Sequence, residues 1–227
     1  MHLPDGILPW WQSLIYFGIS LPFIAIAFKK LRKQLGETSS STISLLAAGI
    51  FVVQTIHFPI PGGTCAHVVG AAIVAYFLGA WGVIAVASIV LLVQATFGEG
   101  GITAYGANVL SMGIIAGFAA AYILKIGKKR AESKRSSEIS EENKVPKTML
   151  NFLVLASFVS TLLTGVIAGI EVAISGTIPF WTVVPIMFAW HIFLGIIDAI
   201  MTVSIIKYIS QNSPEIVSNA EFSVTYT

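Results

Sequence analysis

Charge and cysteine are both scarce in this sequence. Only 11% of its 227 residues are charged, whereas soluble domains average about 25%, so there are too few charges to solvate every side of a globule. The single cysteine, Cys65, excludes an internal disulfide framework. The small net charge of +2 gives no sign of a nucleic-acid partner. The HExxH, GxSxG and Walker A motifs are missing as well, which removes three familiar signatures of enzymes and ATPases.

Apolar residues, in contrast, are abundant and come in long runs. They make up 56% of the chain, and continuous runs are typical of transmembrane helices. Six apolar blocks are present, at roughly 9–28, 43–60, 68–97, 104–126, 148–173 and 180–208. The third would measure about 45 Å as one helix, against a hydrocarbon core of about 30 Å. Because Gly79 and Gly82 interrupt it, it is either one long tilted span or two short spans, 66–79 and 82–97.

The positions of the positive charges decide between these two topologies. The 13 Lys and Arg residues fall within Lys29–Lys33, Lys125–Lys147 and Lys207. With seven spans and an external N-terminus, all three segments lie in the cytoplasm, as the positive-inside rule requires. With six spans, the 127–147 loop would lie outside. We therefore predict an all-α, polytopic membrane protein with seven transmembrane helices, its N-terminus outside and its C-terminus cytoplasmic.

The predicted seven-helix topology also determines the expected domain organisation. Residues 1–208 are expected to form a single membrane domain, and residues 209–227 a polar C-terminal tail. No cleavable signal peptide is expected, because the first basic residue, Lys29, follows the first span. Residues 1–8 are therefore predicted to lie on the outer side.

Met1 and His2 form a chelating motif. A free α-amine, the next peptide nitrogen and Nδ1 of a histidine at position two can bind one ion through unstrained five- and six-membered rings. The peptide nitrogen must lose its proton, which Ni(II) and Cu(II) bring about readily, and the product is a plane of nitrogens. A fourth donor is needed, and His67 on an outer loop is the candidate.

Two outer segments are expected to enclose this site. Residues 57–67 are apolar and constrained by two prolines, and residues 97–108 are rich in glycine, which is expected where two backbones approach closely. Pro4 and Gly6 allow the N-terminal segment to fold back. Asp5, between them, is expected either to accept a hydrogen bond from a ligating imidazole or to stabilise the start of the first span.

Four motifs together resemble the CbiM/NikM family over residues 1 to about 205. They are MHLPDGILPWW at 1–11, GGTCAHVVGAA at 62–72, QATFGEGGITAYGANVLSMG at 94–113 and EVAISG at 171–176. Members of that family are seven-helix, substrate-binding (S) components of energy-coupling-factor (ECF) transporters for nickel or cobalt. The resemblance implies that the Met1 amine, the His2 amide and imidazole, and the His67 imidazole bind the ion. It places His57 and Asn108 beside those ligands.

The resemblance also implies the chain's cargo and partners. Pro4-Asp5 is similar to the nickel branch, whereas cobalt members tend to read MHIMEG, so Ni(II) is expected and Co(II) is the alternative. A transmembrane T component and two cytoplasmic ATPases would supply the energy, with a small accessory membrane subunit as a further candidate partner. The expected location is the plasma membrane of a prokaryote, and the chain itself would not be an enzyme.

A hypothesis from a different class is a membrane-embedded metalloenzyme. Its ligands would be His57, His67 and either Asp198 or Glu171, because hydrolytic zinc sites keep an open position beside a carboxylate base. The predicted topology disfavours this, since it places Asp198 in the inner half of the last span and both histidines outside. Asp198 and Ala199 also depart from the family, which often has an EG-type motif at these positions. The roles of His191 and Asp198 stay open.

Overall fold

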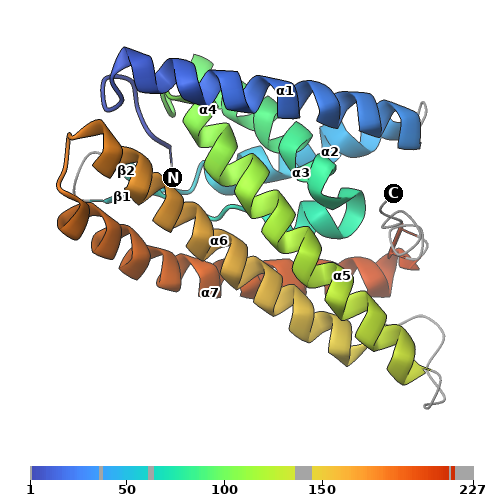
Figure 1. Cartoon of the computed structure of the whole chain (residues 1–227). Helices are drawn as coiled ribbons and strands as arrows, with labels where there is room; N and C mark the ends of the chain where they lie inside the picture. The colour runs from blue at the N-terminus through green and yellow to red at the C-terminus, as the bar shows by residue number, and fades with distance from the viewer. Residues whose placement is uncertain (1, 36–37, 61–63, 136–144, 215, 218–227) are drawn as a thin grey trace.

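The chain folds as a bundle of helices with one small β-hairpin (Figure 1). The computed structural model describes residues 2–35, 38–60, 64–135, 145–214 and 216–217. Its elements, in chain order, are α1 (Trp10–Leu35), α2 (Thr38–Gln54), β1 (Phe58–Ile60), β2 (Thr64–Ala66), α3 (Ala71–Thr96), α4 (Tyr105–Asn108), the π-helix η1 (Val109–Ile115), α5 (Ala116–Arg135), α6 (Lys147–Ser175) and α7 (Phe180–Asn212). Helix α7 thus continues a few residues past the predicted start of the tail, and most of residues 209–227 lie outside the described part of the chain.

Five helical segments of the described chain are long and apolar enough to cross a membrane. They are Trp10–Lys33, Ala71–Thr96, Tyr105–Ser133, Lys147–Ser175 and Phe180–Asn212, and a shorter apolar segment covers Ile43–Gln54. Because α4, η1 and α5 follow one another without a break, they count as one segment. The outward faces of α1 and α7 carry large exposed apolar side chains, Trp10 and Trp181 among them, as a surface that meets lipid requires.

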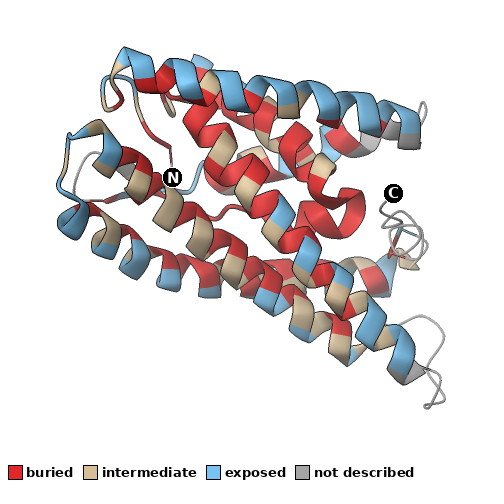
Figure 2. Ribbon diagram, in the orientation of Figure 1, coloured by how far each residue is buried: buried red, intermediate tan, exposed pale blue. Residues whose placement is uncertain are grey.

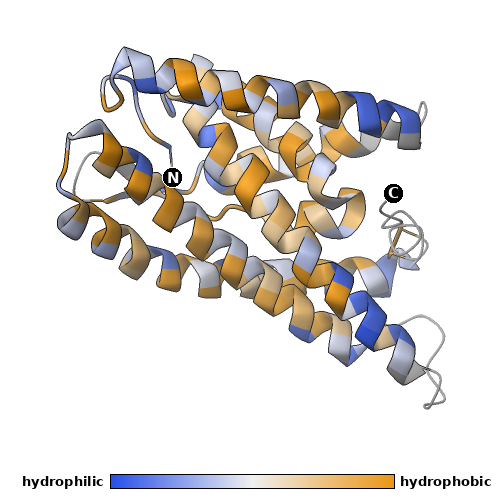
Figure 3. Cartoon of the chain, viewed as in Figure 1, coloured by the Kyte–Doolittle hydropathy of each residue, from blue (hydrophilic) through white to orange (hydrophobic). Residues whose placement is uncertain are grey.

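The two ends of the bundle differ in charge. The last turn of α1 carries Arg32 and Lys33, and in Figure 3 the corresponding end of α1 and the distal half of α5 are coloured as hydrophilic. The N-terminal segment that begins at His2 lies at the opposite end from these segments, whereas the last turns of α7 lie at the same end as they do (Figure 1). Basic side chains are therefore gathered at the end that is distant from His2.

Helix α3 is broken at Gly79, where the sequence predicted an interruption. Gly79 has φ 67° and ψ −171°, a conformation that is essentially restricted to glycine. The two arms of α3 then fold back on each other: Val74 of the first arm and Val83 of the second line the same small cavity. The first arm begins only at Ala71, because the residues just before it are not helical and Gly70 adopts a left-handed conformation with φ 72°.

The hairpin is a departure from the all-α expectation. Strands β1 and β2 pair antiparallel, with Pro59 opposite Cys65 and Phe58 opposite Ala66. The sequence predicted only a loop here, because three-residue strands containing proline carry too little alternating pattern to be recognised. The hairpin matters for function because it delivers Cys65 and His67 to the same place.

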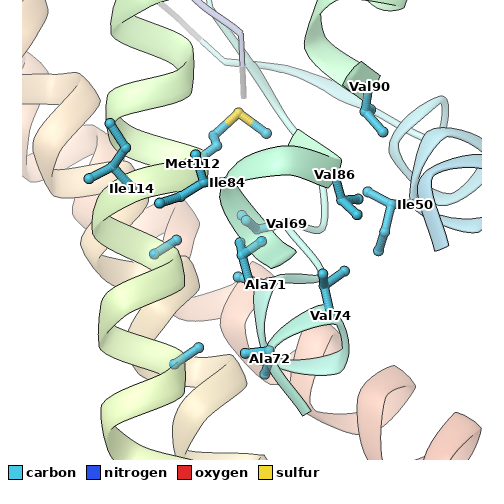
Figure 4. Close-up of a cluster of buried hydrophobic side chains, with 14 of the residues drawn as sticks. Ile50, Val69, Ala71, Ala72, Val74, Ile84, Val86, Val90, Met112 and Ile114 are labelled. Carbon is cyan, nitrogen blue, oxygen red and sulfur yellow. The ribbon is translucent and has the colours of Figure 1, made fainter. Parts of the chain in front are cut away.

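The core is centred on α3. Nearly all of its residues are buried, whereas α1 and α7 are exposed along their outer faces (Figure 2). Side chains from both arms of α3 meet Met112 of η1 and Ile50 of α2 in a continuous apolar cluster (Figure 4). The N-terminal part of α5 lies close against α3, since a Cβ on Gly117 would be 3.2 Å from the Ala80 carbonyl oxygen.

Candidate metal centre

The N-terminal segment enters the bundle and is held there by its backbone. Leu3 is fully buried, and both of its backbone polar groups are bonded. Its N–H donates to Asn108 Oδ1 at 2.9 Å, and its carbonyl accepts from Asn108 Nδ2 at 3.2 Å. The same carbonyl accepts the backbone N–H of Gly101 at 2.9 Å. Asn108 therefore clamps the residue that follows His2.

Glycines in the 98–104 loop make this docking possible. A Cβ on Gly100 would lie 3.0 Å from His2 Cβ, and one on Gly101 would overlap the backbone nitrogen of Asp5. The close backbone approach predicted from the glycine content of this loop is thus confirmed. The loop forms a wall against which the N-terminal segment packs.

Three potential ligands meet where the N-terminal segment touches the hairpin. One ligand atom each from His2, Cys65 and His67 lie within 4.8 Å of one another. The two imidazole rings are stacked, with centroids 4.4 Å apart and planes inclined by 26°. His2 is 4% exposed, His67 is fully buried and Cys65 is partly buried. Among the described residues this is the one cluster of His, Cys and acidic groups that could hold a metal ion.

The hydrogen bonds of these histidines leave lone pairs available. Nδ1–H of His67 donates to the Val68 carbonyl at 2.9 Å, so its Nε2 carries the lone pair. Nε2 of His67 and Nε2 of His2 are buried and have no hydrogen-bond partner among the described residues. Burial holds the pKa of His2 well below its ordinary 6.5, and the neighbouring Gln94 opposes this only in part. A lowered pKa favours the neutral imidazole, which is the form that binds a metal ion.

The chemistry of this donor set favours borderline transition-metal ions. Imidazoles suit nickel, copper and zinc, and thiolates suit softer ions, whereas magnesium and calcium prefer oxygen ligands. The cluster of His2, Cys65 and His67 includes no carboxylate.

The structure brings together two of the predicted ligands, His2 and His67, from segments 65 residues apart in the chain. Met1, the third predicted ligand, lies outside the described residues. Asn108, predicted to lie beside the ligands, contacts the backbone of Leu3 rather than an imidazole.

Asp5 has a partner that the sequence did not indicate. Its Oδ1 accepts hydrogen bonds from the backbone N–H and the hydroxyl of Thr103. Neither of these partners is an imidazole or a residue of the first turn of α1. These bonds hold the pKa of Asp5 below its ordinary value of 3.8. Asp5 thus fastens the N-terminal segment to the 98–104 loop. A third fastening follows at Ile7, whose carbonyl accepts the Thr177 hydroxyl at 2.8 Å.

His57 lies outside the buried cluster. It is exposed, and its Nδ1 is bonded to the Thr55 carbonyl at 3.1 Å. Cys65, in contrast, belongs to the cluster although the sequence analysis gave it no role. The spacing of Cys65 and His67 could have indicated this. In an extended segment residues i and i+2 face the same side, so Cys65 would lie beside His67.

Asp198 links the segment after His67 to two long helices. It accepts hydrogen bonds from the backbone N–H of Gly70 at 3.2 Å and from the Thr161 hydroxyl of α6. It therefore has a structural role, remote from the imidazoles. His191 of α7 is also buried, with Nδ1 bonded to the Met187 carbonyl at 2.6 Å. Neither residue joins the cluster around His2.

Comparison with known proteins places this arrangement in a family. The model of a family described as CbiM, cobalt uptake substrate-specific transmembrane region, matches residues 2–216. A fused nickel transport protein, NikMN, of Rhodobacter capsulatus is 30% identical over 96% of this chain, which spans 64% of that protein. A cobalt transport protein, CbiM, of Sorangium cellulosum is 37% identical over 52% of this chain and 54% of its own length.

A solved structure described as a transition metal transporter shares the fold. Its TM-score is 0.80 at 24% sequence identity, with 98% of each chain covered. These relatives are transport proteins, and their names include both nickel and cobalt. With a family model matched along almost the whole sequence, the chain belongs to the CbiM family of substrate-specific transmembrane proteins for metal uptake.

Proposed function

We propose that this chain is the substrate-binding subunit of an ECF-type importer and that it captures Ni(II) on the outer side of the plasma membrane of a prokaryote. The observation that carries the proposal is the buried cluster at the N-terminus, where the His2 and His67 rings stack and Nε2 of His67 has no hydrogen-bond partner among the described residues. Energy would come from outside the chain, through a transmembrane T component, two cytoplasmic ATPases and a candidate accessory membrane subunit.

The proposed topology has seven crossings, with the N-terminus outside. The reversal at Gly79 supports it, because it turns α3 into two arms that run in opposite directions. The first arm, Ala71–Leu78, is only about 12 Å long as a helix, so the non-helical residues before it must complete that crossing. The gathering of basic residues at the end remote from His2 supports this orientation under the positive-inside rule.

The proposed chelate uses four nitrogens. The Met1 amine, the His2 amide nitrogen and His2 Nδ1 would close two fused rings on one ion, and Nε2 of His67 would supply the fourth donor, since its Nδ1 is occupied by Val68. The structure favours this set because His2 is already buried and stacked against His67, so little reorganisation precedes binding.

The decisive experiment blocks the N-terminal amine. Acetylation of Met1 removes the amine as a donor and prevents the first ring from closing, while the histidines remain. We expect calorimetry in detergent to show loss of high-affinity nickel binding for the acetylated protein. His67→Ala should abolish the planar nickel absorbance. An unchanged nickel affinity in the acetylated protein refutes the chelate.

Cobalt is the second candidate cargo, because a cobalt transport protein is among the relatives. Nickel–cobalt competition on protein with an authentic N-terminus distinguishes the two. Co-purification with a T component and two ATPases, followed by ATP-dependent uptake into vesicles, tests the assembly. Uptake that needs no second protein contradicts the proposed division of labour.

A further inference from the structure

The sulfur of Cys65 faces the two chelating atoms of His2. The His2 backbone N–H donates to Cys65 Sγ at 3.4 Å, and His2 Nδ1 lies 3.7 Å from the same sulfur. These nitrogens are the pair that closes the six-membered ring in the proposed chelate. An ion bound to both of them would therefore meet the sulfur as its next neighbour.

The hairpin fixes this position. Cys65 is the central residue of β2, paired with Pro59, and His67 follows two residues later. Because both residues belong to one extended segment, their side chains share a side. The sulfur and the His67 ring therefore approach His2 together. The Nε2 atom of His67, which is buried and has no hydrogen-bond partner among the described residues, shows independently that this is a place built for a ligand.

The distances suit donors that share one ion. With metal–nitrogen bonds of about 2.0 Å and a metal–sulfur bond of about 2.3 Å, nitrogen and sulfur on one ion are about 3.1 Å apart at a right angle and about 3.7 Å apart near 120°. The observed separations of 3.4 and 3.7 Å fall between a right angle and that wider angle. A sulfur trans to either nitrogen would lie about 4.3 Å away, so Cys65 is placed above the nitrogen plane.

We propose that Cys65 Sγ is an additional ligand of the captured ion, placed out of the plane of nitrogens. This inference rests on the proposed function, because it concerns the same site. The thiolate is the ligating form, so the thiol proton passes to water as the metal–sulfur bond forms. Sulfur ligation disfavours hard ions such as magnesium and calcium and makes the site a mixed nitrogen–sulfur centre.

The test uses the full chain with its authentic N-terminus, loaded with Ni(II). Cys65 is the only cysteine, so any thiolate-to-nickel charge-transfer band in the near ultraviolet comes from it. We expect this band in the wild-type protein and in His57→Ala, and its loss in both Cys65→Ser and Cys65→Ala. Nickel-edge X-ray absorption should show a sulfur shell at about 2.3 Å that disappears in the same two variants.

Cys65→Ala should also lower nickel affinity by about tenfold or more. Nickel bound tightly to the wild-type protein without the band and without a sulfur shell would overturn the inference but leave the proposed function standing. A sulfur shell that persists in Cys65→Ala would assign the sulfur to a methionine and overturn it too. Absence of any nickel binding by the wild-type protein would overturn both. The charge-transfer band and the sulfur shell are both measured on the wild-type protein. A variant that fails to fold therefore does not decide the question.

Discussion

Asn108 should control metal affinity although it need not touch the metal. It makes two hydrogen bonds to the backbone of Leu3, one to the N–H and one to the carbonyl, and both residues are buried. Replacing Asn108 with Ala removes both bonds at once. The N-terminal segment then loses the contact that follows His2 directly, so His2 is no longer held beside His67.

The size of the affinity loss in Asn108→Ala depends on which hydrogen bonds the Leu3 N–H and carbonyl keep. The Leu3 carbonyl keeps its bond to the Gly101 N–H, so it loses only the net value of one hydrogen bond, about 0.5–1.5 kcal/mol. The Leu3 N–H has no replacement and incurs a desolvation cost of about 1–3 kcal/mol. The sum of about 1.5–4.5 kcal/mol corresponds to a loss of nickel affinity of about 10- to 2,000-fold.

Calorimetric titration with nickel on protein with an authentic N-terminus measures this loss. Asn108→Asp is the sharper variant, because it keeps the shape and the acceptor but cannot donate to the Leu3 carbonyl, and it should also bind weakly. Asn212→Ala is the matched control, since Asn212 also bonds a backbone carbonyl but is exposed at the end of α7. Unchanged affinity in a folded Asn108→Ala protein would refute the anchoring role.

Three further outcomes follow from the fold. Gly79→Ala forces an L-residue into φ 67°, ψ −171° and should lower the free energy of unfolding by about 1–3 kcal/mol. Gly18→Ala is the control and should not lower it, because a Cβ at Gly18 meets nothing within 4 Å. Thermal unfolding in detergent compares the two variants. Asp198→Ala leaves the Gly70 N–H without its acceptor and should cost about 1–3 kcal/mol, with Asn at the same position recovering part of it; equal melting of the Ala variant and wild type would contradict this. The hydrogen bonds from Thr103 lower the pKa of Asp5 below its ordinary value of 3.8. At a pH above 3.8 the ionised carboxylate therefore stabilises the folded state, and this stabilisation is lost as the pH falls through the lowered pKa. The wild-type protein should therefore melt above Asp5→Asn at about pH 6 and together with it at about pH 2, and a gap that persists at the acid end would point to another cause.

The sequence was informative where one residue type settles a local conformation. Gly79 was recognised as a break because no other residue adopts its backbone angles, and the 98–104 loop was recognised as a close approach because Gly100 and Gly101 offer no Cβ. His2 and His67 were placed together by the needs of a chelate, which depend on atom types and ring sizes. In each case a short stretch of chain carried the whole physical requirement.

The sequence was uninformative where a contact joins segments that are distant along the chain. Nothing near Asp5 indicates that Thr103 is its partner, and nothing near Asp198 indicates Gly70, because such pairs exist only once the bundle is packed. Cys65 was overlooked because its relation to His67 appears only when the segment is known to be extended, and a hairpin of three-residue strands leaves almost no periodic pattern.

The anchoring of the N-terminal segment explains how a chain terminus can serve as a high-affinity ligand. Ordering a free backbone costs about 1–2 kcal/mol per residue, so a mobile terminus that closed on the ion would lose much of its binding energy to entropy. Here Leu3, Asp5 and Ile7 are each bonded to other parts of the bundle, and folding has already ordered the backbone up to His2. In the proposed chelate, the ion would then have to order little more than the first residue and its amine. Because the anchors hold His2 against the segment that carries Cys65 and His67, changes at Asn108 or Thr103 should weaken affinity although they substitute none of the proposed ligands.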